Sequence, residues 1–506
     1  MNSSRIRVAA IYAISAWPLF NFLAVNWAEV LSRGFGSILI ILLLTVLIGV
    51  VGHVLFRNGD KFGYGGLVKI GWLALIALFF SYTHVRAFFN VLIETASLRD
   101  PGTIACLLLG LLVLGLVYRY RNVVKLQNVA TTFCLIVGGA SLLTLVVTVF
   151  TTRPVPAANA PSAMVAAASA RAASPDIYYI ILDAYAGKFG MSKLGFDNSA
   201  FLDSMKSRGF ADVSTDMSNY MRTVNTLTSI FALDYAKTED SGTWGIRVYP
   251  QIFDDTNAPA LVGRMKAAGY RVWRSPTIWG SCTNRNLECL GETHVTEPDY
   301  MLQAFLAATP LGRPIAFAVF KEYKTFPLVI SSVPLLRSTP QPDFVFVHYI
   351  SPHPPYFLDR ECRKRDVRSE DWADWNGWDP KDRGAYIGAV ECVNSQTERL
   401  VDKIIQSDPG ALIVLQADHG SGFAVPWDKP MSSWTATQIT ERASYLNLVR
   451  APAECAKWLD HPLGQINTAR FVVGCAEGRA PTYLPEHTYL AAYSIEVDGN
   501  QVRLFK

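Results

Sequence analysis

The feature that most constrains this chain is a set of long apolar segments confined to its first 150 residues. A helix needs about 20 predominantly apolar residues to cross the hydrocarbon core of a bilayer. Five apolar segments of 15 to 22 residues come near this length, and we interpret residues 1–150 as a bundle of five transmembrane helices. The segments cover residues 8–27, 37–55, 67–81, 104–118 and 129–150.

Basic residues around these segments predict how the bundle is oriented. They lie before the first segment, after the second and after the fourth: Arg5, Arg7, Arg57, Lys61, Arg119, Arg121 and Lys125. Cytoplasmic loops of membrane proteins carry an excess of Lys and Arg. Five crossings from a cytoplasmic start then place everything after residue 150 on the outer side. No signal-peptide cleavage pattern precedes the first segment, so we expect that segment to be retained.

The remainder of the chain predicts a linker and a globular domain. Residues 151–174 are rich in Ala, Pro and Ser and have no hydrophobic period, which is typical of a linker. In residues 175–506, strand-like runs alternate with helical patterns, and this order indicates βαβ units with a mostly parallel sheet. The strands are expected at 176–182, 270–273, 343–350 and 411–415, and the helices at 196–209, 261–269 and 386–406.

Polar side chains follow three of these expected strands. Asp183 follows the first, His353 lies between prolines after the third, and Asp418 and His419 follow the last. Runs that are apolar on both faces suit strands buried in a parallel sheet, and open α/β sheets bind ligands at the carboxyl ends of their strands. We therefore expect these side chains to converge. The alternative role for the two carboxylates is an Asx-type turn that caps a strand end.

A hydroxyl-rich segment at the start of an expected apolar helix, residues 218–235, supplies Thr223 and, one turn later, Thr226. Carboxylate, imidazole and hydroxyl groups together suit a divalent metal ion. Oxygen ligands favour Mn²⁺, Mg²⁺ or Ca²⁺, whereas imidazole favours Zn²⁺. Metal coordination activates a threonine hydroxyl, and a helix N-terminus holds anionic groups. Phosphoryl transfer is the chemistry that matches this set of groups.

Six of the eight cysteines lie in the outer domain and form three local pairs in the sequence. An even number of cysteines in a domain outside the cytoplasm indicates disulfides. Spacing leaves their connectivity open, and local pairing is the simplest arrangement. A zinc cluster is the alternative, although no C-x-x-C spacing favours it. The pairs are Cys282/Cys289, Cys362/Cys392 and Cys455/Cys475.

Residues 175–497 resemble the alkaline phosphatase superfamily, and in particular its sulfatase-like branch of membrane-anchored phosphoethanolamine and phosphoglycerol transferases. The resemblance rests on IILDA at Asp183, SNYMRT and TLTS at Thr223, FVHYISPHPPY at His353, LQADHG at Asp418, and the C-terminal segments ERASYLNLVRAP and INTARFVV. Formylglycine sulfatases need a C-x-P-S-R pattern, and no cysteine in this sequence begins one. A sulfatase of that type is therefore not expected.

The resemblance implies a role for each matched residue. The expected metal ligands are Asp183, Thr223, Asp418 and His419. Thr223 would also be the nucleophile, and Thr226 is its alternative.

The expected substrate contacts are His353, Asn225 and Thr226. Of these, His353 would bind the phosphate or protonate a leaving group.

The resemblance also implies an activity and a location. The chain would move a phosphorylated headgroup from a membrane phospholipid, through a threonine-bound intermediate, to an envelope glycan or lipid-linked saccharide. It would lie in the bacterial cytoplasmic membrane with its catalytic domain in the periplasm. A hydrolase of the same fold and a non-enzymatic envelope binding protein are the alternatives. The net charge of +4 over 506 residues, without a Lys/Arg-rich run, argues against a nucleic-acid partner.

Overall fold

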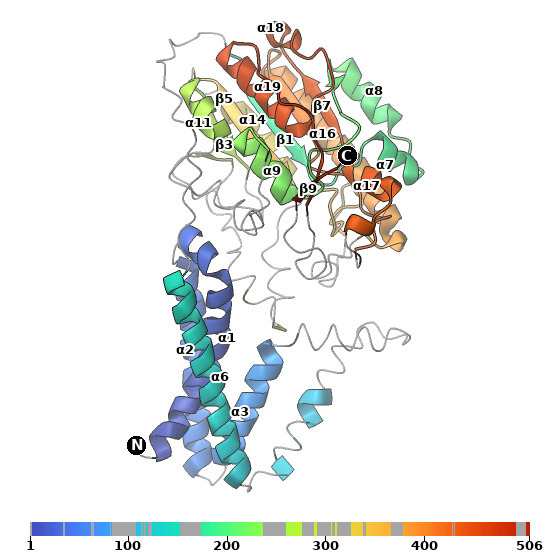
Figure 1. Cartoon of the computed structure of the whole chain (residues 1–506). Helices are drawn as coiled ribbons and strands as arrows, with labels where there is room; N and C mark the ends of the chain where they lie inside the picture. The colour runs from blue at the N-terminus through green and yellow to red at the C-terminus, as the bar shows by residue number, and fades with distance from the viewer. Residues whose placement is uncertain are drawn as a thin grey trace. The chain divides into compact units, whose positions relative to one another are not determined.

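A computed structural model gives the fold of the chain in two compact units (Figure 1). The helical unit comprises Met1–Val155 with Pro298–Phe320, and the α/β unit comprises Pro156–Glu297 with Lys321–Lys506. The structure describes residues 3–33, 36–61, 65–80, 108–112, 118–119, 124–151, 174–235, 260–275, 288–290, 309–310, 325–336, 341–365, 378–427, 431–491 and 502–505, with a few single residues between them. The expected linker, residues 151–174, lies almost wholly outside the described residues, and the division at residues 150 and 174 stays a prediction.

Four long helices of the helical unit pack beside one another (Figure 1). At one crossing the backbones of α1 and α6 approach closely, because a Cβ added to Gly138 would lie 2.7 Å from the carbonyl oxygen of Ala13. Small residues at such crossings are typical of helices that associate in membranes. The helices are α1 (Ser3–Arg33), α2 (Gly36–Lys61), α3 (Gly65–Phe80) and α6 (Val124–Thr151).

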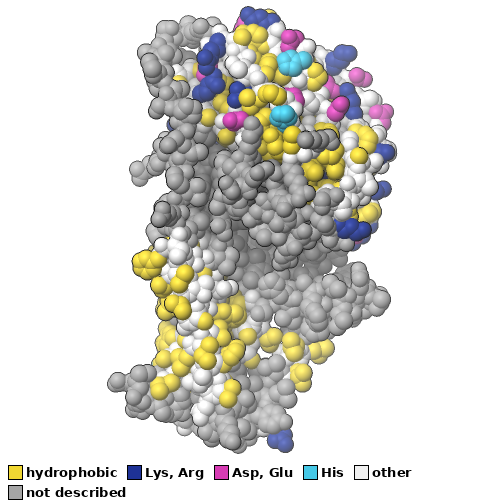
Figure 2. Space-filling model, in the orientation of Figure 1, with side chains coloured by type: hydrophobic (Ala, Val, Ile, Leu, Met, Phe, Trp, Pro, Cys, Tyr) yellow, Lys and Arg dark blue, Asp and Glu magenta, His cyan; other side chains and the backbone are white. Residues whose placement is uncertain are grey.

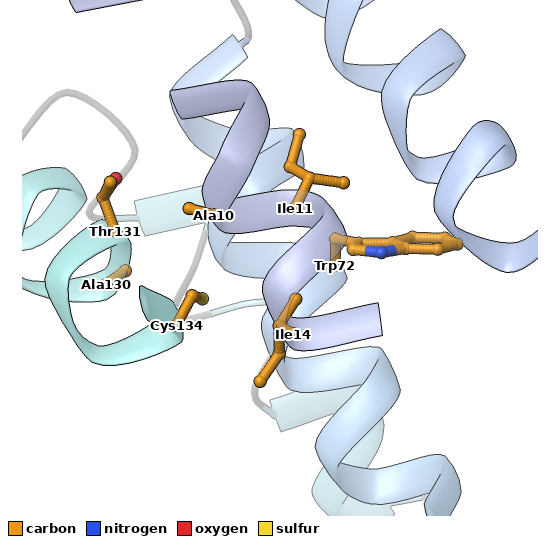
Figure 3. A pocket seen from close by; sticks show the side chains of 7 residues that line it. All are labelled: Ala10, Ile11, Ile14, Trp72, Ala130, Thr131 and Cys134. Carbon is orange, nitrogen blue, oxygen red and sulfur yellow. The ribbon is translucent and has the colours of Figure 1, made fainter. Parts of the chain in front are cut away.

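A small pocket opens between α1, α3 and α6 (Figure 3). Its described lining holds no charged side chain: Ala10, Ile11, Ile14, Trp72, Ala130, Thr131 and Cys134. The indole of Trp72 donates a 3.0 Å hydrogen bond to Ser15 Oγ, and that hydroxyl donates to the carbonyl oxygen of Ile11 at 2.8 Å. The indole of Trp72 and the hydroxyl of Ser15 are therefore both engaged within the helices.

Two helical stretches are long and apolar enough to cross a membrane, Ile38–Gly59 in α2 and Asn128–Thr151 in α6. Only 22% and 11% of their most apolar windows are buried, whereas the core helix of a soluble protein would be mostly buried. The exposed side chains of the helical unit are mainly hydrophobic, and the charged side chains gather on the α/β unit (Figure 2). An apolar surface of this kind is typical of a membrane anchor.

The five-helix bundle that the sequence predicts is only partly confirmed. The second and fifth segments lie in the two qualifying helices. The first lies in α1, where the apolar stretch Val8–Ala24 is shorter, and the third lies in α3, which has 16 residues. These two helices are too short in their apolar part to pass as spans by length alone. About half of the fourth segment, residues 104–118, falls outside the described residues.

The α/β unit is built on a seven-stranded mixed sheet with the strand order β2-β7-β6-β1-β5-β3-β4. The central strand β1 pairs in parallel with β5 and β6, and β3 pairs in parallel with β4 and β5. Strand β7 is antiparallel to both of its neighbours. The expected parallel core is thus confirmed, and an antiparallel edge is added to it. The strands are β1 (Ile177–Leu182), β2 (Ala211–Asp212), β3 (Arg271–Arg274), β4 (Glu288–Cys289), β5 (Asp343–Tyr349), β6 (Leu412–Gln416) and β7 (Asn447–Arg450).

Helices cover both faces of this sheet, which is why β1 is apolar throughout. Alternate side chains of β1 enter opposite cores: Tyr178 and Ile180 belong to one buried cluster, and Tyr179 and Ile181 to the other. The first cluster includes α8 (Ser199–Ser207), α14 (Thr325–Leu336) and α16 (Arg383–Ser407). The second includes α9 (Thr223–Ala232), α11 (Ala260–Ala267) and α19 (Gln465–Glu477). The sheet is therefore a middle layer between two layers of helices (Figure 1).

Shorter elements complete the α/β unit. Helix α17 is held at its start by a capping box in which Thr435 and Gln438 exchange hydrogen bonds. Strands β8 and β9 pair in antiparallel fashion and form a separate two-stranded sheet. The elements are α7 (Lys188–Lys193), α17 (Ala436–Ala443), α18 (Ala453–Ala456), β8 (Tyr489–Ala491) and β9 (Val502–Leu504).

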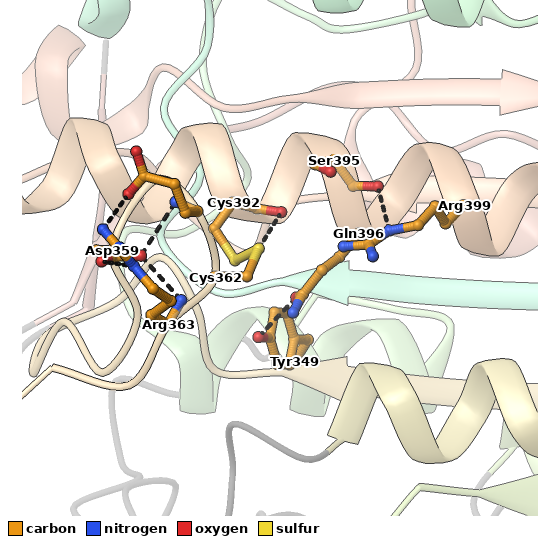
Figure 4. Close-up of a disulfide and its surroundings, with 9 residues drawn as sticks. Tyr349, Asp359, Cys362, Arg363, Cys392, Ser395, Gln396 and Arg399 are labelled. Carbon is orange, nitrogen blue, oxygen red and sulfur yellow. Dashed lines mark hydrogen bonds and ion pairs between the residues drawn. A yellow bond between two sulfur atoms is a disulfide. The ribbon is translucent and has the colours of Figure 1, made fainter.

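Two disulfides join described residues of the α/β unit. Cys362–Cys392 joins the segment after β5 to α16, beside the exposed Asp359–Arg363 ion pair (Figure 4). Cys455–Cys475 joins α18 to α19. Both are local pairs, and disulfides of this kind persist in oxidising compartments. Cys282 lies outside the described residues, so its pairing with Cys289 stays a prediction.

Candidate active site

The site forms where β1 and β6 end side by side. These strands are parallel neighbours, with Ile181 opposite Gln416, so the residues that follow them meet at one edge of the sheet. The carboxylate of Asp418 is fixed there because its Oδ1 accepts hydrogen bonds from the backbone amides of Ala184 and His419, both at 2.9 Å.

Two carboxylate oxygens at this edge have no hydrogen-bond partner among the described residues. They are Oδ1 of Asp183 and Oδ2 of Asp418, and both are buried. They lie 3.8 and 3.3 Å from Nε2 of His419. Buried polar atoms are nearly always satisfied, so two such oxygens beside one imidazole nitrogen indicate a place for a cation.

His419 presents a lone pair to these oxygens. Its Nδ1 lies 3.0 Å from the carbonyl oxygen of Gly420, so Nδ1 carries the ring hydrogen and donates it. Burial is the main cause that keeps the pKa of His419 well below its usual value, and nearby Arg442 adds to this effect. The ring is therefore neutral at pH 7, and Nε2 is available as a metal ligand.

The electrostatics of the two acids support the same interpretation. Burial raises the pKa of Asp183 to about 6 and that of Asp418 to about 7, and the negative charge of Asp183 contributes to the second shift. A cation bound between these two carboxylates would favour their ionised forms. One ligand atom from each of Asp183, His353 and His419 also lies within 4.8 Å of the other two. These residues fit a divalent metal ion that takes oxygen and nitrogen ligands.

The structure separates the two threonines. Thr223 is the first residue of α9, and its Oγ1 lies 3.2 Å from Nε2 of His419. The hydroxyl of Thr226 is fully buried and donates a 3.0 Å hydrogen bond to the carbonyl oxygen of Asp418. Thr223 therefore faces the candidate metal ligands, while Thr226 holds the strand end in place. Asn225 is buried on the same helix.

His353 lies beside this group. Its ring centre is 6.2 Å from that of His419 and 5.8 Å from that of Trp378. Nδ1 of His353 is 2.5 Å from the carbonyl oxygen of Pro354, so this nitrogen carries the ring hydrogen. Burial is the main cause that lowers the pKa of His353. The expected convergence of four polar side chains is thus present in the geometry.

Sequence reasoning missed the role of His348. This residue reads as part of a buried strand, and it is indeed fully buried in β5, opposite Ile181. Its Nε2 lies 3.1 Å from Oδ2 of Asp183. Because burial lowers the pKa of His348 to about 4, the ring is neutral, and Nε2 donates its hydrogen to Asp183. The contact orients Asp183 and leaves its Oδ1 toward the site.

Sequence reasoning also missed Arg442 of α17. Its segment supports the resemblance, but the arginine itself carries no distinguishing signal in the sequence. In the structure its Nη2 lies 3.0 Å from Nε2 of His419. A buried positive charge therefore directly adjoins the candidate metal ligands.

The fold and the buried Asp/His group define an α/β protein with a candidate metal site at the edge of its sheet. Residues 175–453 match the family model described as Sulfatase, which is more than half of the chain. The chain therefore belongs to the Sulfatase family. No curated protein matches it by sequence.

Solved structures with a similar chain path include a periplasmic domain, a lipoteichoic acid synthase and a glycosaminoglycan-locus protein. The C-terminal periplasmic domain of EcEptC from Escherichia coli has 13% identity and a TM-score of 0.40, with 66% of this chain and 98% of that chain covered. The lipoteichoic acid synthase LtaP from Listeria monocytogenes has 10% identity and a TM-score of 0.38, with 60% and 72% covered. A protein of the Bacteroides thetaiotaomicron glycosaminoglycan locus has 16% identity and a TM-score of 0.41, with 60% and 73% covered.

Proposed function

We propose that this protein is a membrane-anchored, metal-dependent phosphotransferase. It takes a phosphoethanolamine or phosphoglycerol headgroup from a membrane phospholipid, holds it on Thr223 and passes it to an envelope glycan or lipid-linked saccharide. The observation that carries the proposal is the position of the Thr223 hydroxyl at the start of α9. It lies 3.2 Å from His419, beside the unsatisfied oxygens of Asp183 and Asp418.

The residues that would hold the metal ion are Asp183, Thr223, Asp418 and His419. A bound divalent ion lowers the pKa of a coordinated hydroxyl and stabilises charge on a transferring phosphoryl group. Thr223 Oγ attacks phosphorus and gives up its proton, an Oγ–P bond forms, and the bond from phosphorus to the diacylglycerol oxygen breaks. That oxygen takes up a proton, so diacylglycerol leaves as an alcohol. The first-turn amides of α9 and the positive end of its dipole favour the anionic group at this place.

The second half of the reaction returns Thr223 to its free state. A hydroxyl of the acceptor attacks phosphorus, and the Oγ–P bond breaks. His353 is suited to take the proton of that hydroxyl, because burial keeps its imidazole neutral at pH 7.

Intact mass of the purified full chain after incubation with zinc and phospholipid tests the proposal. Wild type should gain a headgroup-sized mass, Thr223→Ala should gain none, and Thr223→Ser should retain the adduct because it keeps a hydroxyl. Chelation of the metal should abolish the adduct. If Thr223→Ala turns over phospholipid as fast as wild type, Thr223 is not the nucleophile and the proposal fails.

A hydrolase is the second candidate, because the chain belongs to the Sulfatase family and water can replace the acceptor hydroxyl at the same site. Headgroup release in the absence of any glycan, at the rate seen in its presence, would favour hydrolysis. Release that depends on the glycan would favour transfer. A purely structural role is disfavoured by two unsatisfied buried carboxylate oxygens, since burying them without a ligand costs stability.

A further inference from the structure

Gln465 joins the two segments that carry the expected nucleophile and a candidate metal ligand. It is the first residue of α19, and it is fully buried. Its Oε1 accepts a 2.7 Å hydrogen bond from the backbone amide of Asn219, four residues before Thr223. Its Nε2 donates to the backbone carbonyl oxygens of Asp418 at 3.0 Å and of Ala417 at 3.3 Å. One side chain therefore spans both segments.

Asn219 binds the start of α19 in return. Its Oδ1 accepts a 3.0 Å hydrogen bond from the backbone amide of Ile466. The first-turn amides of a helix have no acceptor within that helix, so this contact also completes the start of α19. Its Nδ2 donates to the carbonyl oxygen of His487 at 2.9 Å. The segment before α9 is thus fixed to α19 through two side chains.

The backbone carbonyl of Asp418 completes the connection. It accepts a second hydrogen bond, from the hydroxyl of Thr226 at 3.0 Å. A carbonyl oxygen has two lone pairs, so Gln465 and Thr226 can bind it together. Thr226 lies in α9, which begins at Thr223. These hydrogen bonds and the chain from residue 219 to residue 226 form a closed ring, which we call the Gln465 ring: Asn219, Gln465, Asp418 and Thr226.

Further buried hydrogen bonds anchor the start of α19 to the sheet. Nδ2 of Asn447 in β7 donates at 2.8 Å to the carbonyl oxygen of Leu463, two residues before Gln465. Oδ1 of Asn447 accepts from Nε2 of Gln416 in β6 at 3.0 Å. Buried polar networks whose hydrogen bonds are satisfied make a structure rigid and specify one arrangement. The Gln465 ring is therefore held against two strands of the sheet.

The partners of Gln465 distinguish it from another buried glutamine. Gln396 of α16 is 5% exposed, and its Oε1 accepts from the hydroxyl of Tyr349 at 2.9 Å (Figure 4). That contact joins two elements through their side chains. Gln465 instead binds the backbones of the segments that carry Thr223 and Asp418. Its hydrogen bonds therefore act on the position of the site.

We propose that Gln465 is a positioning residue that sets the spacing between Thr223 and Asp418 through the Gln465 ring. The inference rests on the proposed function, in which these two residues are the nucleophile and a metal ligand. Reacting groups must be held close to their productive geometry, and a misplacement of about 1 Å can cost about 100-fold in rate. Loss of Gln465 should therefore slow the chemical step more than it weakens substrate binding.

Two measurements on the full chain test the inference. One is the visible absorption of bound Co²⁺, which reports the geometry of its ligands. The other is the rate of Thr223 adduct formation, followed by intact mass with zinc and vesicles of phosphatidylethanolamine and phosphatidylglycerol.

Gln465→Met keeps the length of the side chain and removes its three hydrogen bonds. It should change the cobalt spectrum, because the segments that carry the ligands shift. It should also lower the maximal rate of adduct formation roughly 10- to 100-fold. The KM for phospholipid should stay within about threefold of wild type, because no substrate contact is removed.

Gln396→Met is the matched control, because it removes the hydrogen bond of a second buried glutamine. It should leave the cobalt spectrum and the adduct rate close to those of wild type. A Gln465→Met variant that matches wild type in both readouts would overturn the inference. Equal changes in the two variants would assign the effect to a general loss of stability and would also overturn it.

If Gln465→Met does not fold, Thr226→Val tests the ring at its other contact. Valine is close to threonine in shape, and the variant loses the hydroxyl that donates to Asp418. The cobalt spectrum should change and the adduct rate should fall. An unchanged spectrum and rate would refute the inference.

The two readouts separate this inference from the proposed function. A cobalt spectrum that depends on Gln465, in a protein that forms no Thr223 adduct, would sustain the positioning role and reject the transferase. An adduct in wild type, with spectrum and rate indifferent to Gln465, would sustain the transferase and reject the inference. A wild-type protein that binds no cobalt would reject both.

Discussion

At the scale of single residues, the site depends on which atoms of each side chain are already engaged. Asp418 uses one oxygen for two backbone amides and leaves the other unsatisfied. Asp183 is arranged in the same way, because His348 occupies one of its oxygens. In each residue, one carboxylate oxygen fixes the orientation of the side chain, and the other oxygen stays available to coordinate a metal ion.

Asp418→Asn should separate metal binding from folding. The amide can keep the oxygen that accepts from Ala184, so the loop should be preserved, but the charged ligand is lost. We expect zinc affinity to fall about 100-fold or more, and the metal-free protein to melt at a higher temperature at pH 8 because a buried charge is removed. Zinc titration and thermal unfolding measure the two effects. Asp402→Asn, an exposed partner of Arg208, should change zinc affinity little, and equal losses in both variants would reject Asp418 as a ligand.

The raised pKa values predict how zinc binding depends on pH. Asp183 and Asp418 have pKa values of about 6 and about 7, so protons compete with zinc below these values. Zinc affinity should therefore rise as pH increases from 5.5 to 8. The native metal-free protein binds these protons more tightly than the unfolded chain, so these groups lower its stability as pH rises from about 4 to about 7. A zinc affinity that is flat over this range would contradict the assignment of these ligands.

At the scale of elements, the site depends on a close approach between the segment after β6 and helix α17. A Cβ added to Gly420 would lie 2.5 Å from the carbonyl oxygen of Glu441 and closer still to that of Ser444. The amide of Gly420 donates to the carbonyl oxygen of Arg442 at 2.8 Å. Only glycine permits this approach, which brings Arg442 to His419.

Gly420→Ala should therefore destabilise the α/β unit. The added methyl group would clash with backbone atoms, which cannot rotate away as a side chain can. We therefore expect a loss of about 1–3 kcal/mol in the free energy of unfolding. Denaturant unfolding of the metal-free protein measures this loss. Gly384→Ala is a suitable comparison, because its Cβ would meet nothing within 4 Å near the start of α16. Similar unfolding curves for the two variants would show that the approach is unimportant.

At the scale of the whole molecule, an apolar helical unit and a disulfide-bonded α/β unit belong to one chain. The exposed apolar faces of α2 and α6 match a lipid environment, while the disulfides match an oxidising one. Both properties agree with an α/β unit outside the cytoplasm, as the basic residues between the apolar segments predict.

A tag placed after Lys506 should therefore be accessible from outside the cell membrane. In intact bacterial spheroplasts, added protease should remove the tag, and a cytoplasmic marker protein should remain whole. Immunoblots of the tag and the marker provide the measurement. A tag that is degraded only after the cells are lysed would place the α/β unit in the cytoplasm and exclude the proposed access to periplasmic glycans.

The sequence by itself determined the features that depend on local pattern. Apolar runs located α2, α6, β1, β5 and β6, and alternation of strands and helices indicated the parallel core. The polar residues at three strand ends could be predicted to converge, because parallel strands end at a common edge. Family-like motifs then pointed to the residues Asp183, Thr223, His353 and Asp418.

Only the tertiary structure decided which atoms meet. The register between β1 and β5 brings His348 to Asp183, and no local pattern marks that residue. The packing of α17 against the segment after β6 brings Arg442 to His419. The start of α9 turns Thr223 toward His419 and Thr226 toward the backbone of Asp418. Periodicity reports which face of an element is buried, whereas contacts between distant elements depend on register and close packing.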